Sequence, residues 1–473
     1  MPKVPLCDLY VYDTASVFEA MSLINKNTMG MVFVVDSSMR LLGMLSDGDV
    51  RRGLLNGVGL DENVCCIMQK EYRFMLRNEV LDFQALQHFR LIPVVDYNHT
   101  LIDYYSSKNQ FFPIALPLLN GNELTYLLDA FLSSWISSSG AYILDFEEAF
   151  AAYCGTKFGV SVFNGSVALV LALSALGITK GDEVIVPDLT FGATINAVLL
   201  VGATPVIVDI EQDSWCIDPE SIRAAITNKT KAIIPVHLYG QVCDMDNIMR
   251  IAKEYKLYVV EDCAEAHGAS FNGQMVGSFG DIGCFSFFGN KVITTGEGGM
   301  CVCNDKKLND TMRILRDHGM DKHKRYWHTH IGFNYRMTNL QAAIGLAQLE
   351  RIDTILNNRK YYESSYINAL VPHIQPQPSL PNREKIVWLA SFLLDSTCCS
   401  RDELLHTLKS KGVDARAFFY PLSDMPIYAQ YSRASTPVSH SISARGFSLP
   451  TYESLQNLQD IIKVLQSTLK EYE

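Results

Sequence analysis

The middle of the chain alternates between short hydrophobic runs, typical of buried strands, and longer stretches with the spacing of helices. Strands that alternate with helices require crossover connections, which predicts a mainly parallel sheet. Ligands bind such sheets at the carboxyl ends of the strands, so polar residues there are the first candidates for a site. The predicted strands cover residues 159–163, 183–187, 205–209, 232–236 and 257–261, and polar residues follow them at 164–166, 188–190 and 262.

The first 110 residues contain a repeated pattern. Each unit has a buried strand, a turn and a second strand, and helical stretches such as residues 15–24 precede them. The strands fall at 30–36 and 42–51 in the first unit, and at 91–96 and 100–104 in the second. This pattern resembles a tandem pair of CBS modules.

Two residues of the first unit match the CBS motif that contacts the ribose and phosphate of a nucleotide. Ser46 and Asp49 have its spacing, and residues 103–106 of the second unit lack it. The resemblance therefore implies an adenine-nucleotide site at Ser46 and Asp49. The alternative is a spacer or dimerisation module in which the same two residues cap the next helix.

The character of the sequence changes again near residue 111 and near residue 360. We expect a CBS-pair-like α+β domain at 1–110, a large α/β domain at 111–360 and a smaller α+β domain at 361–473. A long helical pattern covers 340–367, and a strand is predicted at 386–394. Ser400 and Glu403 have the spacing of a capping box, which predicts the start of a helix.

Composition excludes several classes of protein. The 473 residues are 48% hydrophobic and carry a formal net charge of −11, which argues against a nucleic-acid binder. Twelve scattered cysteines with no CxxC pair favour reduced thiols in a cytoplasmic protein and no metal site. No signal peptide is evident, and residues 164–166 interrupt the longest uncharged run, 158–179, so no membrane span is expected.

Lys291 is the candidate reactive residue. It stands between the apolar run 282–288 and the glycine-rich turn 296–299, whose backbone can approach a ligand closely. A lysine among apolar neighbours loses the solvation of its charged form, so we expect a lowered pKa and a nucleophilic amine. A surface lysine is the alternative.

Other candidates are weak individually and specific together. Gly165 and Ser166 open a helix, where free amides attract phosphate, and the Ser286 hydroxyl is a second phosphate ligand. Phe191 is suited to cover a flat ring, and Asp262 to pair with a ring nitrogen. With an aldehyde on Lys291, this set describes pyridoxal phosphate, although each residue alone has a structural explanation as a turn, core aromatic or helix cap.

From about residue 111 onward the chain resembles the sugar aminotransferases of the DegT/DnrJ/EryC1/StrS family. These are fold-type I pyridoxal-phosphate enzymes, with a mainly parallel sheet in a large domain and a small α+β domain. The motifs that carry the resemblance are SWISS at 134–138, NGSVAL at 164–169, VHLYG at 236–240, EDCAEA at 261–266, the stretch 285–300, and GFNYRMTN at 332–339.

The resemblance assigns a role to each matching residue. Lys291 is implied to be the Schiff-base lysine, Asp262 the partner of the pyridine nitrogen, and Glu265 the neighbour of the phenolic oxygen. Ser286 is implied to bind the phosphate, and Asn334 to reach it across a subunit interface. This implies a homodimer with shared active sites, or a higher oligomer. A related branch with histidine at the lysine position performs a dehydration, so Lys291 favours transamination.

The expected reaction transfers an amino group from L-glutamate to a nucleotide-linked 4-keto-6-deoxy sugar, with GDP-4-keto-6-deoxy-mannose favoured. The product is a 4-amino-4,6-dideoxy sugar for surface polysaccharide. A UDP- or dTDP-linked acceptor, or a non-catalytic nucleotide-sensing regulator, are the alternatives. Residues 322–328 combine basic and aromatic side chains, and Lys324, Arg325 and His328 are candidates for a diphosphate clamp. A solvated loop is the alternative there.

Overall fold

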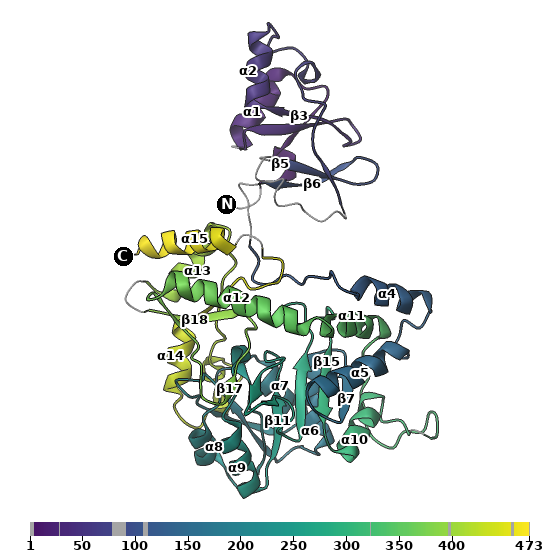
Figure 1. Ribbon diagram of the computed structural model, residues 1–473, viewed down its shortest axis with the longest axis vertical. Coiled ribbons are helices and arrows are strands. Elements are labelled where there is room, and N and C mark those ends of the chain that lie inside the picture. The colour runs from purple at the N-terminus through teal and green to yellow at the C-terminus, as the bar shows by residue number, and fades with distance from the viewer. Residues whose placement is uncertain are drawn as a thin grey trace. The chain divides into compact units, whose positions relative to one another are not determined.

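The computed structural model describes residues 4–27, 29–77, 91–106, 112–321, 323–395, 399–455 and 458–472. The chain divides into two compact units. The first is Met1–Phe112 together with Ser410–Gly412, and the second is Pro113–Lys409 together with Val413–Glu473 (Figure 1).

The first unit contains two three-stranded sheets of the same design. In each, the first strand runs parallel to the second, and the second pairs antiparallel with the third. A register shift occurs at the same place in both hairpins, Val34/Val35 and Val94/Val95. The sheets are β1 (Tyr10–Tyr12), β2 (Met31–Val35) and β3 (Leu41–Ser46), and β4 (Met75–Leu76), β5 (Leu91–Val95) and β6 (Leu101–Ser106). The predicted internal repeat is therefore present.

The two sheets share one hydrophobic core. Phe33 of the first hairpin and Tyr104 of the second lie in the same buried cluster, with ring centroids 6.4 Å apart. Helices α1 (Val17–Asn27) and α2 (Asp47–Leu55) pack on the first hairpin. The helix predicted at 15–24 is α1, which begins two residues later and extends to Asn27.

A seven-stranded sheet forms the centre of the second unit. Its order is β7-β15-β14-β11-β10-β8-β9, and all neighbours are parallel except β15, which runs antiparallel to β14 and β7. The strands are β7 (Phe158–Val162), β8 (Glu183–Pro187), β9 (Thr204–Val208), β10 (Thr230–Ile233), β11 (Tyr258–Asp262), β14 (Ile282–Ser286) and β15 (Gly299–Cys303). The predicted mainly parallel sheet is confirmed, and the antiparallel β14–β15 pair adds to it.

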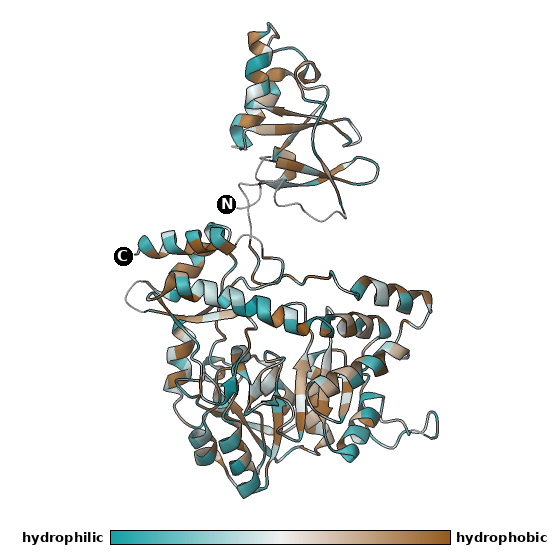
Figure 2. Cartoon of the chain, viewed as in Figure 1, coloured by the Kyte–Doolittle hydropathy of each residue, from teal (hydrophilic) through white to brown (hydrophobic). Residues whose placement is uncertain are grey.

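Helices cover both faces of this sheet, and a separate hydrophobic cluster fills each face. Strand β8 is buried at all five positions, as expected for a strand covered on both sides. Figure 2 shows hydrophilic residues on the outer helices α8 and α9, and hydrophobic ones in the strands nearer the middle of this unit. The helices are α4 (Glu123–Leu132), α5 (Ala141–Tyr153), α6 (Gly165–Ala175), α7 (Ala193–Leu200), α8 (Pro219–Ala225), α9 (Met245–Tyr255) and α10 (Lys306–Arg316).

The helical pattern at 340–367 forms two helices rather than one, α11 (Asn339–Leu349) and α12 (Ile352–Leu370). The break is held by contacts from elsewhere: Asn122 and Tyr126 donate hydrogen bonds to Glu350, and Arg351 pairs with Glu453. The boundary predicted at 360/361 lies inside α12 and stays a prediction.

A four-stranded antiparallel sheet follows, in the order β16-β18-β20-β19. The strand predicted at 386–394 is limited to β18, and the capping box at Ser400 and Glu403 is confirmed, because the carboxylate accepts from both the Ser400 amide and hydroxyl. The strands are β16 (Ile374–Pro376), β18 (Ala390–Leu394), β19 (Arg416–Ala417) and β20 (Gly446–Leu449). The helices are α13 (Arg401–Ser410), α14 (Pro437–Arg445) and α15 (Leu458–Lys470), and a small sheet joins β12 (Ser270–Phe271), β13 (Gln274–Met275) and β17 (Arg383–Glu384).

None of the helices that the structure describes is both long enough and apolar enough to cross a membrane.

Candidate active site

A cavity of about 470 Å³ opens at the carboxyl ends of the parallel strands in the second unit. This is where such sheets bind ligands. Its wall combines residues that follow β7, β8, β11 and β14 with residues of the C-terminal segment. The lining includes Asn164, Gly165, Ser166, Thr190, Phe191, Tyr239, Asp262, Glu265, Ser286, Asn290, Lys291, Glu297, Trp388, Arg416, Phe419 and Ser448.

Lys291 lies in the connection between β14 and β15, and its amine points into this cavity. The amine is 3.6 Å from Oε1 of Glu265 and 4.1 Å from the ring centroid of Trp388. Burial lowers the pKa of Lys291, while the carboxylates of Glu265 and Asp262 act in the opposite direction. The expected reactive environment of this lysine is present.

Asp262 ends β11 and has hydrogen-bond donors on both carboxylate oxygens. The Thr194 hydroxyl donates to Oδ2 at 2.9 Å, and the Ala264 amide donates to Oδ1 at 3.2 Å. Burial nevertheless raises the pKa of Asp262. A cationic ring nitrogen beside it would supply the charge that stabilises the ionised form.

Glu265 shares the cavity with Lys291. Burial raises the pKa of Glu265 to about 7, and the Lys291 ammonium opposes this rise. The backbone amide of Tyr239 holds the other carboxylate oxygen at 3.0 Å. Tyr239 adopts the left-handed region, with φ of 53°, so a sparsely populated backbone conformation presents this amide to Glu265.

The start of helix α6 approaches the end of β14 closely. Asn164 caps the helix by accepting the Val167 amide at 3.0 Å, while the first amides of the helix have no partner within it. A Cβ atom at Gly165 would lie 2.7 Å from the Cβ of Ser286, so only glycine permits this approach. The Ser286 hydroxyl and the helix start thus converge on one end of the cavity, which suits a phosphate.

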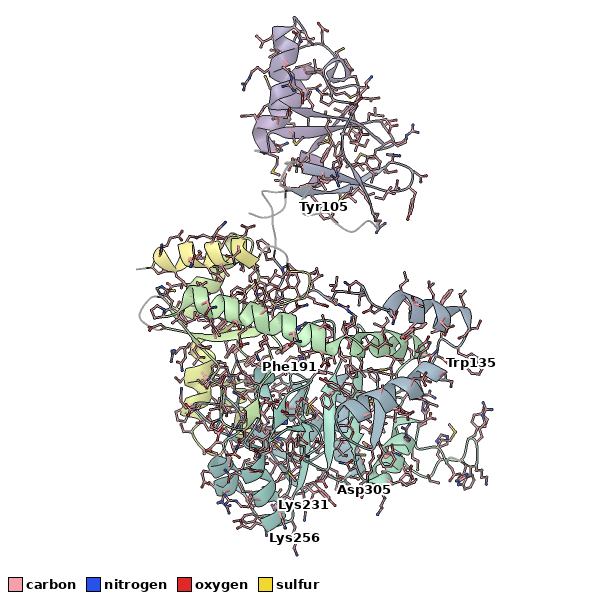
Figure 3. The ribbon with its side chains drawn as sticks, viewed as in Figure 1. Tyr105, Trp135, Phe191, Lys231, Lys256 and Asp305 are labelled. Carbon is pink, nitrogen blue, oxygen red and sulfur yellow. The ribbon has the colours of Figure 1, made fainter. Side chains whose placement is uncertain are left out.

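Phe191 forms part of the wall on the side of the C-terminal segment. Phe191, labelled in Figure 3, is 60% exposed, and its ring centroid lies 5.7 Å from that of Phe419. The face of an exposed aromatic ring beside Asp262 and Lys291 is suited to cover a flat ligand.

These residues fit pyridoxal phosphate. The helix start provides an anion site. Among the residues that the structure describes, no cation lies in salt-bridge contact with the buried carboxylate of Asp262, and the buried Oδ1 atom of Asn290 has no hydrogen-bond partner. The Lys291 amine, whose pKa is lowered, lines the same cavity. A mainly parallel sheet with this set at its carboxyl edge defines a pyridoxal-phosphate-dependent aminotransferase.

Comparison with known proteins gives the family. Residues 117–467 match the DegT/DnrJ/EryC1/StrS aminotransferase family, and the chain belongs to it. Residues 4–56 match the CBS domain, as the repeat near the N-terminus predicted.

Curated relatives and solved structures agree with this assignment. The chain is 46% identical to GDP-perosamine synthase of Caulobacter vibrioides over 74% of this chain and 96% of that protein. It is 38% identical to UDP-N-acetyl-3-dehydro-alpha-D-glucosamine 3-aminotransferase of Acidithiobacillus ferrooxidans, over 78% and 99%. The putative sugar aminotransferase Spr1654 of Streptococcus pneumoniae, in its PLP form, matches with a TM-score of 0.72 and 27% identity, over 77% and 100%.

Four predicted residues do not line this cavity. Lys324 lies 3.8 Å above the ring of Trp327, and Arg325 packs on a neighbouring tyrosine ring. His328 and Asn334 are exposed on the same segment. The diphosphate clamp and the phosphate contact of Asn334 across a subunit interface therefore stay predictions.

Tyr239, Trp388 and Arg416 also line the cavity, and sequence patterns predicted none of them as site residues. Trp388 and Arg416 come from segments 97 and 125 residues after Lys291, and no local pattern marks them. Tyr239 lies in a motif used for the family resemblance. Its role comes from its backbone amide, which donates to Glu265 while Tyr239 has a positive φ, and the sequence does not show this conformation.

Behind Asp262, the buried group of His237, Glu261 and Cys263 has residue types that bind metals. The carboxylate oxygens of Glu261 already accept the amides of residues 277, 279 and 280, and Oε2 also lies 3.1 Å from His237 Nε2. The Cys243 amide lies 3.2 Å from the other ring nitrogen of His237. This group forms a hydrogen-bond network that fixes the end of β11.

In the first unit, Ser46 and Asp49 form a capping box at the start of α2. The Ser46 hydroxyl donates to Asp49 Oδ2 at 2.5 Å, and Gln69 and Arg52 donate to Oδ1. Burial raises the pKa of Asp49, but these hydrogen bonds outweigh it and hold the pKa below its usual value. The capping geometry is present, and nucleotide contact by the two residues stays a prediction.

Proposed function

We propose that the protein transfers the amino group of L-glutamate to C4 of a nucleotide-linked 4-keto-6-deoxy sugar, with GDP-4-keto-6-deoxy-mannose as the favoured acceptor. The product is a 4-amino-4,6-dideoxy sugar for surface polysaccharide, made in the cytoplasm. The observation that carries the proposal is the amine of Lys291 in one cavity with Asp262 and Glu265. The similarity to GDP-perosamine synthase supports the choice of acceptor.

Lys291 moves the protons in both halves of the reaction. Pyridoxal phosphate, when bound, supplies an aldehyde that bonds to amines and a ring that accepts an electron pair. The lowered pKa of Lys291 favours the free amine, which removes the Cα proton of the donor. In the second half, the protonated amine delivers a proton to C4 of the sugar.

The other cavity residues would hold the cofactor. Asp262, which accepts a hydrogen bond from Thr194, would pair with the ring nitrogen and keep it protonated, and Glu265 would neighbour the phenolic oxygen. Gly165, Ser166 and Ser286, which line the cavity with Phe191, would bind the phosphate, and Phe191 would cover the ring.

We also propose a homodimer with shared active sites. Helix α4 and the segment after it expose an unusual amount of apolar surface: Phe131 is 62% exposed, Leu132 78% and Trp135 62% (Trp135 is labelled in Figure 3). Large apolar side chains exposed close together in the sequence support an interface there. Asn334 is exposed, as a residue that reaches a neighbouring subunit should be.

Mixed subunits test the sharing directly. Lys291→Ala and Asn334→Ala homodimers are both expected to be inactive or severely impaired. A hybrid of the two subunits contains one site with both original residues if Asn334 acts across the interface. Mixing after mild dissociation should then restore activity toward half of the wild-type value per hybrid. No restoration in a verified hybrid would place Asn334 in its own subunit's site or outside the site.

The segment at 323–328 is proposed to clamp the nucleotide diphosphate. The ammonium of Lys324 and the guanidinium of Arg325 each lie over a neighbouring aromatic ring. Both cationic groups are at an exposed surface. Lys324→Ala combined with Arg325→Ala should raise KM for the nucleotide sugar about tenfold and leave KM for glutamate unchanged. An unchanged KM for the sugar nucleotide would show that the segment is a solvated loop.

A UDP- or dTDP-linked acceptor is the second candidate, favoured by the similarity to the UDP-sugar aminotransferase. A panel of GDP-, UDP- and dTDP-linked 4-keto-6-deoxy sugars with glutamate, with and without adenine nucleotides, tests both candidates. We expect the highest kcat/KM with the GDP sugar. A visible absorption band that fails to change on adding glutamate would instead support a non-catalytic regulator.

A further inference from the structure

A buried arginine lies behind the segment that carries Lys291. Arg359 of helix α12 is only 4% exposed, and burial lowers its pKa to about 10. Among the residues that the structure describes, it forms no salt bridge at 4 Å or less. A buried charge without a carboxylate in contact is unfavourable, so its hydrogen bonds decide what it contributes.

Arg359 uses its two terminal nitrogens on two backbone carbonyls of the site. Nη2 donates to the carbonyl oxygen of Lys291 at 3.2 Å, and Nη1 donates to the carbonyl oxygen of Trp388. One guanidinium therefore links the reactive lysine to the tryptophan whose ring its amine contacts. The planar fork of arginine suits this task, since its donors have fixed directions.

Trp388 completes the connection from the other side. Its indole Nε1 donates to the carbonyl oxygen of Asn290 at 2.9 Å, and its ring lies 4.1 Å from the Lys291 amine. The backbone on both sides of the lysine's Cα is thus held, by Trp388 before it and by Arg359 after it. The connection between β14 and β15 is fixed where the lysine side chain begins.

We infer that Arg359 is a positioning residue for Lys291. It fixes the lysine backbone and the Trp388 ring relative to each other, so that the amine moves between donor and acceptor from an anchored starting point. The inference rests on the proposed role of Lys291 in proton transfer. A displacement of about 1 Å in such a group costs on the order of a hundredfold in rate.

The chain contains a matched control. Arg401 is likewise buried, 6% exposed, and its Nη1 donates to the carbonyl oxygens of Ser443 and Gly446 at 2.7 and 3.3 Å. Arg401 does not line the cavity. Arg401→Lys therefore reports the effect of removing a buried guanidinium from two carbonyls outside the cavity lining. Arg401 differs from Arg359 in also pairing with Asp402, at 2.6 Å.

The test compares Arg359→Lys, Arg359→Met and Arg401→Lys in the full chain. In the glutamate half-reaction, followed by the visible absorption of the bound cofactor, Arg359→Lys should lower the rate constant about tenfold and Arg359→Met about a hundredfold. The concentration of glutamate for half-saturation should change less than about twofold. Arg401→Lys should lower the thermal midpoint and leave this rate within about twofold of wild type.

A second measurement does not need the cofactor or the sugar. In cofactor-free protein, an amine-reactive reagent labels lysines, and peptide mass spectrometry gives the rate for Lys291. Arg359→Lys should change this rate at least threefold, whereas Arg401→Lys should not. The inference would be overturned if Arg359→Lys left both the labelling rate and the half-reaction rate unchanged. It would also be overturned if Arg401→Lys lowered the half-reaction rate as much as Arg359→Lys does. A wild-type enzyme that fails only with the sugar substrates would refute the proposed acceptor and leave this result intact.

Discussion

A carboxylate follows a buried strand in both units, and its surroundings differ. Asp49 comes after β3, where Ser46, Arg52 and Gln69 donate to both of its oxygens. Asp262 ends β11 on the wall of a cavity, and burial raises its pKa while hydrogen bonds hold that of Asp49 down. Both carboxylates accept hydrogen bonds at both oxygens, but among the described residues only Asp49 has a cation in contact, Arg52. An acid at a strand end thus indicates where a ligand can bind, and its burial and the charge beside it decide whether it needs one.

The largest effect is expected at Lys291, because its buried amine has no counterpart beside Asp49 in the described part of the first unit. Lys291→Ala removes the group that bonds the cofactor and transfers protons, so turnover should fall by at least about 10⁴-fold. The visible absorption of the lysine-bound cofactor should disappear as well. Lys360→Ala, at an exposed position of α12, is the control. Substantial remaining turnover in the Lys291 variant would refute its role.

Asp262→Asn should have the next largest effect. It removes one partner of the buried ion pair with the ring nitrogen, a loss of about 3–5 kcal/mol, which corresponds to roughly 10²–10⁴-fold in kcat. Because the amide still accepts from Thr194, the fold should persist, and the thermal midpoint checks this. Turnover near that of the wild type would show that Asp262 is no more engaged by a ligand than Asp49.

The sequence predicted the residues that local motifs mark, Lys291, Asp262 and Ser286, and it placed them at strand ends of a mainly parallel sheet. It did not predict Trp388 or Arg359, because these approach Lys291 only through the packing of distant segments. It also predicted one helix where α11 and α12 are separate. Glu350 and Arg351 at the break favour helix intrinsically, and long-range contacts override that preference.

The pH dependence of stability should have opposite signs in the two regions. The pKa of Glu265 is about 7 in the folded chain against an ordinary value of 4.5, so its contribution is full below pH 4.5 and is lost as the pH rises through 7. At about 1.4 kcal/mol per unit, the effect is at most about 3 kcal/mol. The lowered pKa of Asp49 gives a contribution that is lost as the pH falls.

Thermal unfolding of cofactor-free protein at pH 5 and pH 8 measures this dependence. Glu265→Gln should remove part of the destabilisation that the wild type shows on going to pH 8. Glu363→Gln is the matched control, since Glu363 pairs with Lys385 at 2.8 Å and does not line the cavity. An identical pH dependence in the Glu265 variant and the wild type would mean that Glu265 is already ionised beside Lys291.

The smallest effect on catalysis is expected from Asp49→Asn. As a member of a capping box, Asp49 should contribute about 1 kcal/mol to the stability of the first unit, and its loss should leave kcat within about twofold of wild type.

Because Arg52 and Gln69 occupy Oδ1, a ribose at this carboxylate must displace one of them. Arg52→Ala frees that oxygen, so a nucleotide site should bind AMP more tightly in Arg52→Ala and more weakly in Asp49→Asn. Calorimetric titrations measure both affinities: either change would assign Asp49 to a nucleotide, and neither change would leave it with the capping role alone.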